Sequence, residues 1–304
     1  MASLKELRAR INSVKSTKKI TSAMKMVAAA KLSRAERRSK EAQPYAAAMQ
    51  RVLVSLKRSL GERPGLPPLL AGTGKQDVHL IIPMSSDRGL AGGFNGNINR
   101  ATRNLMNRLL GEGKTVKIFP VGFKALVYWR HEAPKLIVGS EITDFRLGDV
   151  NIQSADHIAS YIESMLANKQ FDVCTVVYNH FKNVMTQVPT ELQLVPLNLA
   201  VTEENDTKQK SFTAPVSGDQ ADYIFEPEED VLLQRLLPQN LRTQIFSAML
   251  ETNAGEQGAR MTAMDSATRN AGKAIDKLSL YYNRTRQANI TNELTEVISG
   301  ANAA

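Results

Sequence analysis

The first 43 residues contain neither proline nor glycine, and this constrains the fold more than any other feature of the chain. Alanine, lysine, arginine, methionine, leucine and glutamate dominate the segment, and all of them favour helices. We therefore expect one helix from about Ser3 to about Leu60, with Pro44 as the position where it could bend. At 1.5 Å per residue such a helix is a rod of about 85 Å, a length typical of coiled coils.

The apolar residues of this predicted helix form a narrow seam at three- and four-residue spacing. The seam consists of Leu4, Leu7, Ile11, Val14, Thr17, Thr21, Met24 and Ala28. An extra three-residue step between Val14 and Thr17 is a stammer, which locally overwinds a coiled coil. Because the seam is thin and partly polar, the helix needs a partner helix.

The partner is expected at the other end of the chain. No proline follows Pro238, and residues from Leu241 to Ser299 read as a second long helix. Its interior glycines, Gly255, Gly258 and Gly272, each cost about 1 kcal/mol relative to alanine, which indicates a packing reason.

Small residues recur through the second helix and match a small patch at residues 28–30 of the first. They are Ala254, Gly255, Gly258, Ala259, Thr262, Ala263, Ser266 and Ala267. We interpret the two segments as a close contact between antiparallel helices. In that register Met24 lies opposite residues 260–264, and the last twenty or so residues of the second helix are unpaired.

Between the two helices, apolar strands alternate with helices. The expected strands are 78–82, 116–121, 173–178 and 191–195, and the expected helices are 97–110, 123–130 and 154–168. Buried strands separated by helices predict a parallel sheet. The predicted fold class is α/β with long terminal helices, namely an antiparallel coiled coil of the N- and C-terminal helices plus a Rossmann-like parallel-sheet domain. The predicted divisions are 1–60, 61–230 with linkers, and 231–304.

No local pattern indicates catalysis, a metal or a cofactor. The glycine cluster from Gly89 to Gly96 matches neither the G-x-G-x-x-G nor the G-x-x-x-x-G-K-[ST] phosphate-binding motif. We therefore favour a tight turn over nucleotide binding at this cluster. The four histidines show no ligand spacing, and no nucleophile, base and orienting group can be assembled. Cys174, the one cysteine, lies in an apolar run and is expected in the core, which fits a reducing compartment.

The positive charge is concentrated at one end of the chain. Residues 1–60 carry +12, residues 61–241 carry −4 and residues 242–304 carry +1. A basic arm fits an acidic partner, which could be nucleic acid, anionic lipid or an acidic protein surface, or it is simply a solvated helix face. No aromatic residue that could stack on bases precedes Gln43. A nucleic-acid-binding protein and an α/β enzyme with helical extensions stay open as alternatives at this point.

The segment near the C-terminus is apolar where a frayed helix end is usually polar. Its apolar residues are Ile290, Leu294, Val297 and Ile298, and we name them the apolar bearing tip. If the second helix is unpaired there, these side chains need an apolar surface of another protein that surrounds them and excludes water. The sequence has no stretch of about 20 apolar residues for a membrane span and no signal peptide, so we expect an intracellular soluble or peripheral protein.

Three ordered motifs resemble the gamma subunit family of F-type ATP synthases. The C-terminal motif is ITNELTEVISGA at 290–301, the N-terminal motif is KKITSAMKMVA at 18–28, and the central motif is SSDRGLAGGFN at 85–95. Together they span almost the whole chain. Members of the family in chloroplasts carry a cysteine pair for redox control, which this chain lacks. The resemblance and the absence of a transit peptide favour a bacterial member.

The resemblance implies a non-catalytic rotor shaft rather than an enzyme. It implies partners in the alpha and beta subunits that form a ring around the shaft, in the epsilon subunit and in the ring of c subunits, with no nucleic acid. It also implies a peripheral location at the cytoplasmic face of the cell (inner) membrane, with association through the c-ring only. Rotor–stator contacts are implied, by their match to the family motifs, for Met24, Lys25, Arg286, Gln287, Thr291 and Glu293.

Overall fold

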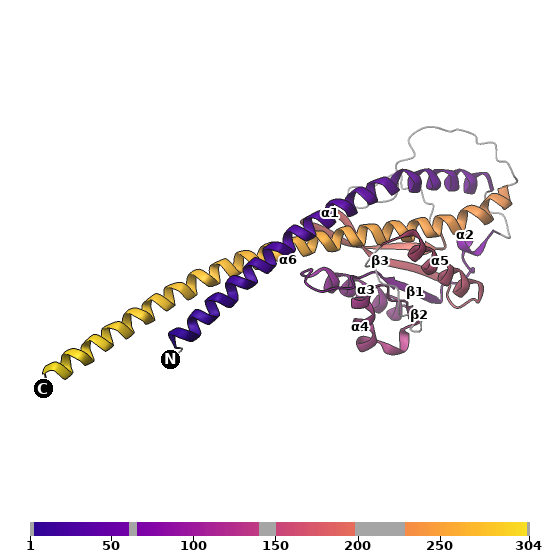
Figure 1. Ribbon diagram of the computed structural model, residues 1–304. Coiled ribbons are helices and arrows are strands. Elements are labelled where there is room, and N and C mark those ends of the chain that lie inside the picture. Colours follow the sequence, from indigo (N-terminus) through magenta and orange to yellow (C-terminus); the bar gives the residue numbers. More distant parts are fainter. Residues whose placement is uncertain (1–2, 61–65, 140–149, 198–228, 303–304) are drawn as a thin grey trace. The chain divides into compact units, whose positions relative to one another are not determined.

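The computed structural model describes residues 3–60, 66–139, 150–197 and 229–302. The chain forms two compact units. One comprises Met1–Ala30 with Arg260–Ala304, and the other comprises Lys31–Ala259. The two longest helices, α1 (Leu4–Leu60) and α6 (Glu229–Asn302), each contribute to both units. Figure 1 labels the elements along the chain.

The expected N-terminal helix is confirmed as α1, which continues without interruption through Pro44. The C-terminal helix begins earlier than expected, because α6 starts at Glu229 and contains Pro238 in its interior. Pro238 removes one hydrogen bond, but the apolar stripe Leu233, Leu237 and Leu241 is buried on both sides of it. Burial of this stripe keeps the segment helical across the proline.

The second unit contains a four-stranded sheet with the strand order β2-β1-β3-β4. The strands are β1 (Val78–Pro83), β2 (Thr115–Ile118), β3 (Val173–Asn183) and β4 (Thr186–Val195). The expected parallel pairing is confirmed for β1 with β2 and with β3. The last strand differs, because β3 and β4 form an antiparallel hairpin. The turn between them is too short for a crossover helix, which a parallel pair requires.

Helices cover both faces of this sheet (Figure 1). One face packs against α5 (Ile152–Ala167) and the middle of α6, and the other packs against α3 (Phe94–Gly111) and α4 (Phe123–Glu132). Alternate residues of β1 serve the two faces, since Leu80 and Ile82 lie in the first cluster and Ile81 in the second. The remaining short helices are α2 (Pro68–Ala71), inside the expected linker, and η1 (Pro134–Leu136).

The β3–β4 hairpin is longer than the sequence indicated, and its end packs on the long helices within the second unit. Phe181 and Val184 contact a small cluster of Leu32, Ala35 and Ala254. Polar residues such as Asn179 and Lys182 hid this extension, because they break the apolar run that marked the strand.

Two of the α6 glycines have a different role from the expected one. A Cβ atom on Gly255 would lie 3.1 Å from the Phe94 ring, and one on Gly258 would lie 3.3 Å from the Phe181 ring. These glycines therefore make room for α3 and the hairpin, and the prediction that they serve the approach of the N-terminal helix was wrong. A helical glycine signals a close neighbour, but the sequence does not say which neighbour.

We predict that Gly258→Leu destabilises the second unit. The new side chain has to displace Phe181, and overpacking of this kind costs about 1–3 kcal/mol. The measurement is urea unfolding followed by fluorescence of Trp129, the single tryptophan, which is fully buried. Gly96→Ala is the control, because a Cβ there meets no atom within 4 Å. Equal unfolding midpoints for the two variants would contradict the packing role.

Candidate functional site on the paired terminal helices

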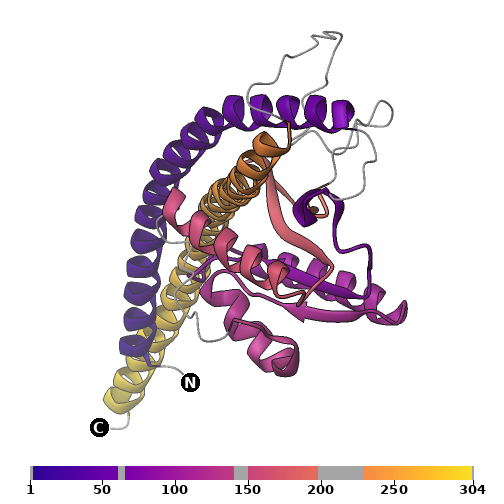
Figure 2. The same cartoon turned by 90° about the vertical axis from the view of Figure 1, so that its right-hand side faces the viewer.

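In the first unit, the N-terminal part of α1 and the C-terminal part of α6 lie side by side and run antiparallel (Figure 1 and Figure 2). Lys25 Nζ lies 2.6 Å from Asp265 Oδ1, and the Thr268 hydroxyl donates a hydrogen bond of 2.7 Å to Thr21 Oγ1. Farther along, Lys18 lies beside Gly272. The paired residue numbers therefore rise on one helix as they fall on the other, which confirms the antiparallel arrangement.

The apolar seam of this pair is confirmed over most of its length. Leu7, Ile11 and Ala28 are buried on α1, and Met264 and Ala271 are buried on α6. Thr17, expected in the seam, is exposed and donates to the Ser13 carbonyl of its own helix. The register agrees with the expected one to within about a turn.

Met24 and Lys25, two of the predicted contact residues, are half-buried at this helix pair. Lys25 is already engaged by Asp265, which also pairs with Arg269 at 3.1 Å on its own helix. The hydrogen bond from Lys25 holds the pKa of Asp265 below its ordinary value. The positive charges of Arg269 and Lys25 act in the same direction, against a contribution from desolvation that raises the pKa. This ion pair could not be predicted locally, because its partners are 240 residues apart.

The remaining predicted residues all lie on the exposed C-terminal part of α6. The register places Leu4 level with Arg286, so the described part of α1 does not reach the apolar bearing tip. The four tip side chains are between 47% and 69% exposed. Arg286, Gln287, Thr291 and Glu293 are also exposed, and the Thr291 hydroxyl donates to the Gln287 carbonyl at 2.9 Å.

These eight residues share one side of the helix. At 3.6 residues per turn, residues 286, 287, 290, 291, 293, 294, 297 and 298 fall within an arc of about 160°. The opposite side carries Ala288, Asn289, Asn292, Glu296 and Ser299. One face of α6 therefore combines large apolar side chains with an arginine, a glutamate, an amide and a hydroxyl, and all of them face solvent.

A second exposed apolar group lies on α1, and the sequence analysis missed it. Ile20, Met26 and Val27 are 60%, 65% and 57% exposed. Their signal was present, because they are apolar residues outside the seam positions Thr21, Met24 and Ala28. On a helix whose seam is already assigned, apolar residues off the seam indicate a second contact surface.

The polar residues of the central motif are used within the second unit. The Ser86 backbone N–H donates to Asn95 Oδ1 at 3.0 Å, and the Phe123 N–H donates to Asp87 Oδ1 at 2.9 Å. Ser85 Oγ accepts from the Ala125 N–H at 2.6 Å. These bonds hold the loop after β1 against the start of α4, which agrees with the interpretation of a tight turn.

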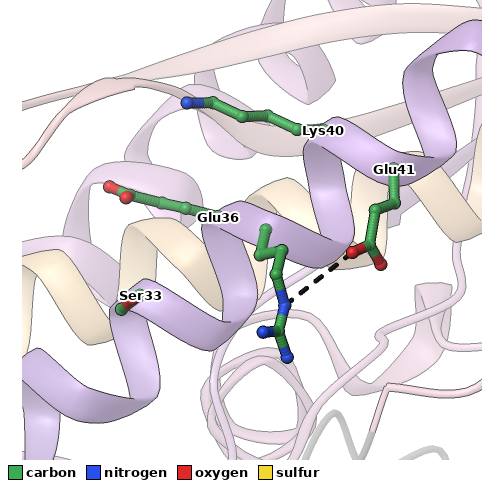
Figure 3. Close-up of a pocket in the computed structure, with 5 residues that line it drawn as sticks. Ser33, Glu36, Lys40 and Glu41 are labelled. Atoms are coloured by element: carbon green, nitrogen blue, oxygen red, sulfur yellow. Dashed lines mark ion pairs between the residues drawn. The ribbon is translucent and has the colours of Figure 1, made fainter.

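Two further titratable groups of the second unit lie within its core. Cys174 is fully buried, and desolvation raises the pKa of its thiol. His180 lies 2.6 Å from Glu251. The described residues contain no group of three side chains that could hold a metal. An open hollow on α1 is lined by Ser33, Glu36, Arg37, Lys40 and Glu41, and Arg37 and Glu41 form an ion pair there (Figure 3).

We predict that the helix pair of the first unit loosens in acid through Asp265. A carboxylate with a lowered folded-state pKa stabilises fully above its unfolded value, which is about 4. That stabilisation is lost as the pH falls through the lower folded-state value. Circular dichroism of the full chain between about pH 6 and pH 2 measures the loss of helix.

Asp265→Asn is expected to remove part of this acid response, because the amide does not titrate. Asp276→Asn, which changes an exposed carboxylate on the same helix, is the control. Superimposable acid titrations for the two variants would show that the Lys25–Asp265 pair makes no difference to the helix pair.

Comparison with known proteins supports one family throughout. The model of the family described as ATP synthase matches residues 3–304. The chain is 58% identical to the ATP synthase gamma chain of Gluconacetobacter diazotrophicus and 55% identical to that of Gluconobacter oxydans, with 100% of each chain covered. It is 50% identical to the gamma chain of Rhodospirillum rubrum at the same coverage. All three relatives are bacterial.

Solved structures agree with this assignment. A chain in the central stalk and c-ring structure of the Tetrahymena thermophila mitochondrial ATP synthase superposes with a TM-score of 0.59 and 26% identity, covering 82% of this chain and 99% of that one. A chain of the Euglena gracilis mitochondrial ATP synthase gives 0.63 at 17% identity, covering 99% and 94%, which shows the fold alone. The chain described here therefore belongs to the ATP synthase gamma chain family.

Proposed function

We propose that the two paired helices are the shaft of a bacterial ATP synthase rotor, which turns with the c-ring and drives conformational change at the catalytic beta subunits. The gamma chain is a non-catalytic subunit of the central stalk. The observation that carries the rotor–stator part of the proposal is the one-sided face of α6 from Arg286 to Ile298.

The exposure of the apolar bearing tip supports the proposal that the ring of alpha and beta subunits forms an apolar surface around it. Burial of a large apolar side chain contributes about 1.5–3 kcal/mol. The four tip side chains are exposed in the isolated chain, so this stabilisation becomes available only on assembly. Hydrophobic contact has no preferred direction, and an apolar collar can therefore hold the helix without fixing its rotational angle.

The polar residues beside the tip suit contacts that change during rotation. Arg286, Gln287, Thr291 and Glu293 are all exposed. Ion pairs and hydrogen bonds in a wet environment contribute little net stability, so they can form and break at a low cost. We assign them the role of transient contacts with the beta subunits.

A second band of contact is proposed on α1. Met24 lies at the helix pair, and Ile20, Met26 and Val27 face solvent near it. Lys15, Lys18, Lys19 and Lys31 are exposed along the same stretch. An apolar group with a basic surround fits a stator segment that is apolar and acidic.

The second unit, which contains the sheet, is proposed to contact the epsilon subunit and the c-ring. Within the described ranges, no helix is apolar over the length that a membrane crossing requires. We therefore propose that the chain is held at the cytoplasmic face of the inner membrane through the c-ring. The alternative of a nucleic-acid-binding protein finds no support in the family assignment.

Purification of a tagged chain from its native membranes tests the proposed assembly. Recovery of alpha, beta, epsilon and c subunits with ATPase activity is the expected result. Recovery of the chain alone or with nucleic acid would count against the proposal.

We predict that serine at all four tip positions uncouples or disassembles the complex. Loss of four apolar side chains removes several kcal/mol of burial, and about 1.4 kcal/mol corresponds to a tenfold change in an equilibrium constant. ATP synthesis by membrane vesicles is therefore expected to fall by more than about tenfold.

The control changes the opposite side of the same helix turns. Asn289→Ser, Asn292→Ser and Glu296→Gln leave the tip face intact and are expected to retain synthesis within about twofold of the parent. Equal losses in the two sets of variants would show that the sidedness of α6 has no role.

A further inference from the structure

The helix pair of the first unit has an apolar seam that specifies axial position weakly. On α6 the buried seam residues are Met264 and Ala271, and Gly272 lies between Ala271 and the exposed part of the helix. On α1 every residue from 15 to 20 is exposed. Where Ala271 and Gly272 of α6 face this exposed stretch, the ridges are shallow and interlock little, so this part of the seam specifies the register weakly.

Two directional contacts between the helices lie one turn apart beside this weak seam. The Thr268 hydroxyl lies within hydrogen-bond distance of two acceptors, Thr21 Oγ1 at 2.7 Å and the Met264 carbonyl of its own helix at 2.8 Å. The Thr21 hydroxyl reaches the Lys18 carbonyl at 3.1 Å. One turn away, Lys25 contacts Asp265, and Arg269 contacts the other oxygen of the same carboxylate.

We propose that Thr21, Lys25, Asp265 and Thr268 form a clasp that sets the axial register of the two helices. A slip of one heptad moves α6 by about 10 Å along α1. The clasp thereby fixes the height at which the apolar bearing tip is presented. The consequence for the tip rests on the proposed function, whereas the register itself does not.

The two parts of the clasp exclude different slips. If α6 moves so that Lys25 faces Gly272, Lys25 loses its contact with the Asp265 carboxylate, and Thr21 faces Ile275. If α6 moves the other way, Lys18 takes the place of Lys25 beside Asp265, since the two lysines are one heptad apart. The ion pair does not distinguish that second slip from the native register.

The threonine pair does distinguish it. In the second slip Thr21 faces Met261 and Thr268 faces Val14, so the hydrogen bond between the hydroxyl groups is lost. A polar pair at one seam position is a well-attested device for fixing register in coiled coils, at some cost in stability. A half-exposed ion pair adds little net stability, which makes register the more substantial contribution of Lys25 and Asp265.

Engineered cysteines in the full chain can report the register directly. The native register places Ile11 level with Leu278, and the second slip places it level with Ala271. One reporter therefore carries Ile11→Cys with Leu278→Cys, and the other carries Ile11→Cys with Ala271→Cys. The native Cys174 is fully buried, so mild oxidation reads the introduced pair.

The test compares disulfide yields from both reporters with and without the clasp threonines. Thr21→Val with Thr268→Val keeps the seam filled in either register, since the valines then face each other or face Met261 and Val14. We expect the ratio of slipped to native disulfide to rise at least about tenfold. Thr17→Val is the control, because Thr17 bonds only within α1, and its ratio should match that of the parent.

A second variant guards against loss of the helix pair. Lys25→Met with Asp265→Asn retains the threonines and should favour the native disulfide. The fourfold variant combines these two changes with Thr21→Val and Thr268→Val, and it should give both disulfides. Ratios that stay at the parental value in the valine variant and in the fourfold variant would overturn the clasp. Because these yields are measured without ring subunits, that failure would leave the rotor proposal standing.

Discussion

The antiparallel contact between the N-terminal part of α1 and the C-terminal part of α6 makes both long helices stable and sets which of their residues stay exposed. Neither terminal helix has a seam wide enough to be stable alone. Pairing buries Leu7, Ile11 and Met264, and the Lys25–Asp265 and Thr21–Thr268 contacts align the two segments. Since α6 continues past the point reached by α1, the pairing also determines which residues stay exposed.

The second unit uses the α6 helix differently, as part of its own core. The middle of α6 packs on one face of the sheet with α5, and its glycines admit Phe94 and Phe181. The α6 helix is thus a core element of the second unit, whereas in the first unit it pairs with α1 and is exposed toward its C-terminus. This double use explains why its sequence has almost no single apolar face over its full length.

Much of the fold, namely the first long helix and most strands of the sheet, could be predicted from the sequence. The absence of proline and glycine gave the first helix, and buried apolar runs gave β1, β2 and β3, since both signals are local. The start of α6 could not be predicted, because burial of Leu233 and Leu237 overrides the local effect of Pro238. The neighbours of Gly258 and Lys25 could not be predicted either, because they are set by residues far along the chain. The eight predicted residues on α6 came from a motif resemblance, and their exposure on one helix face adds a physical reason for grouping them; their contacts with a stator stay a proposal.

Direct observation of rotation tests whether this chain turns inside the ring of alpha and beta subunits. Met185, at the tip of the β3–β4 hairpin, is 78% exposed, and Met185→Cys provides a single accessible thiol because Cys174 is buried. A bead attached there, with the ring of alpha and beta subunits fixed to a surface, reports the motion of this chain. We expect continuous rotation of the bead in one direction when ATP is supplied. A bead that stays fixed while the same complexes hydrolyse ATP would contradict the assignment of this chain as the shaft.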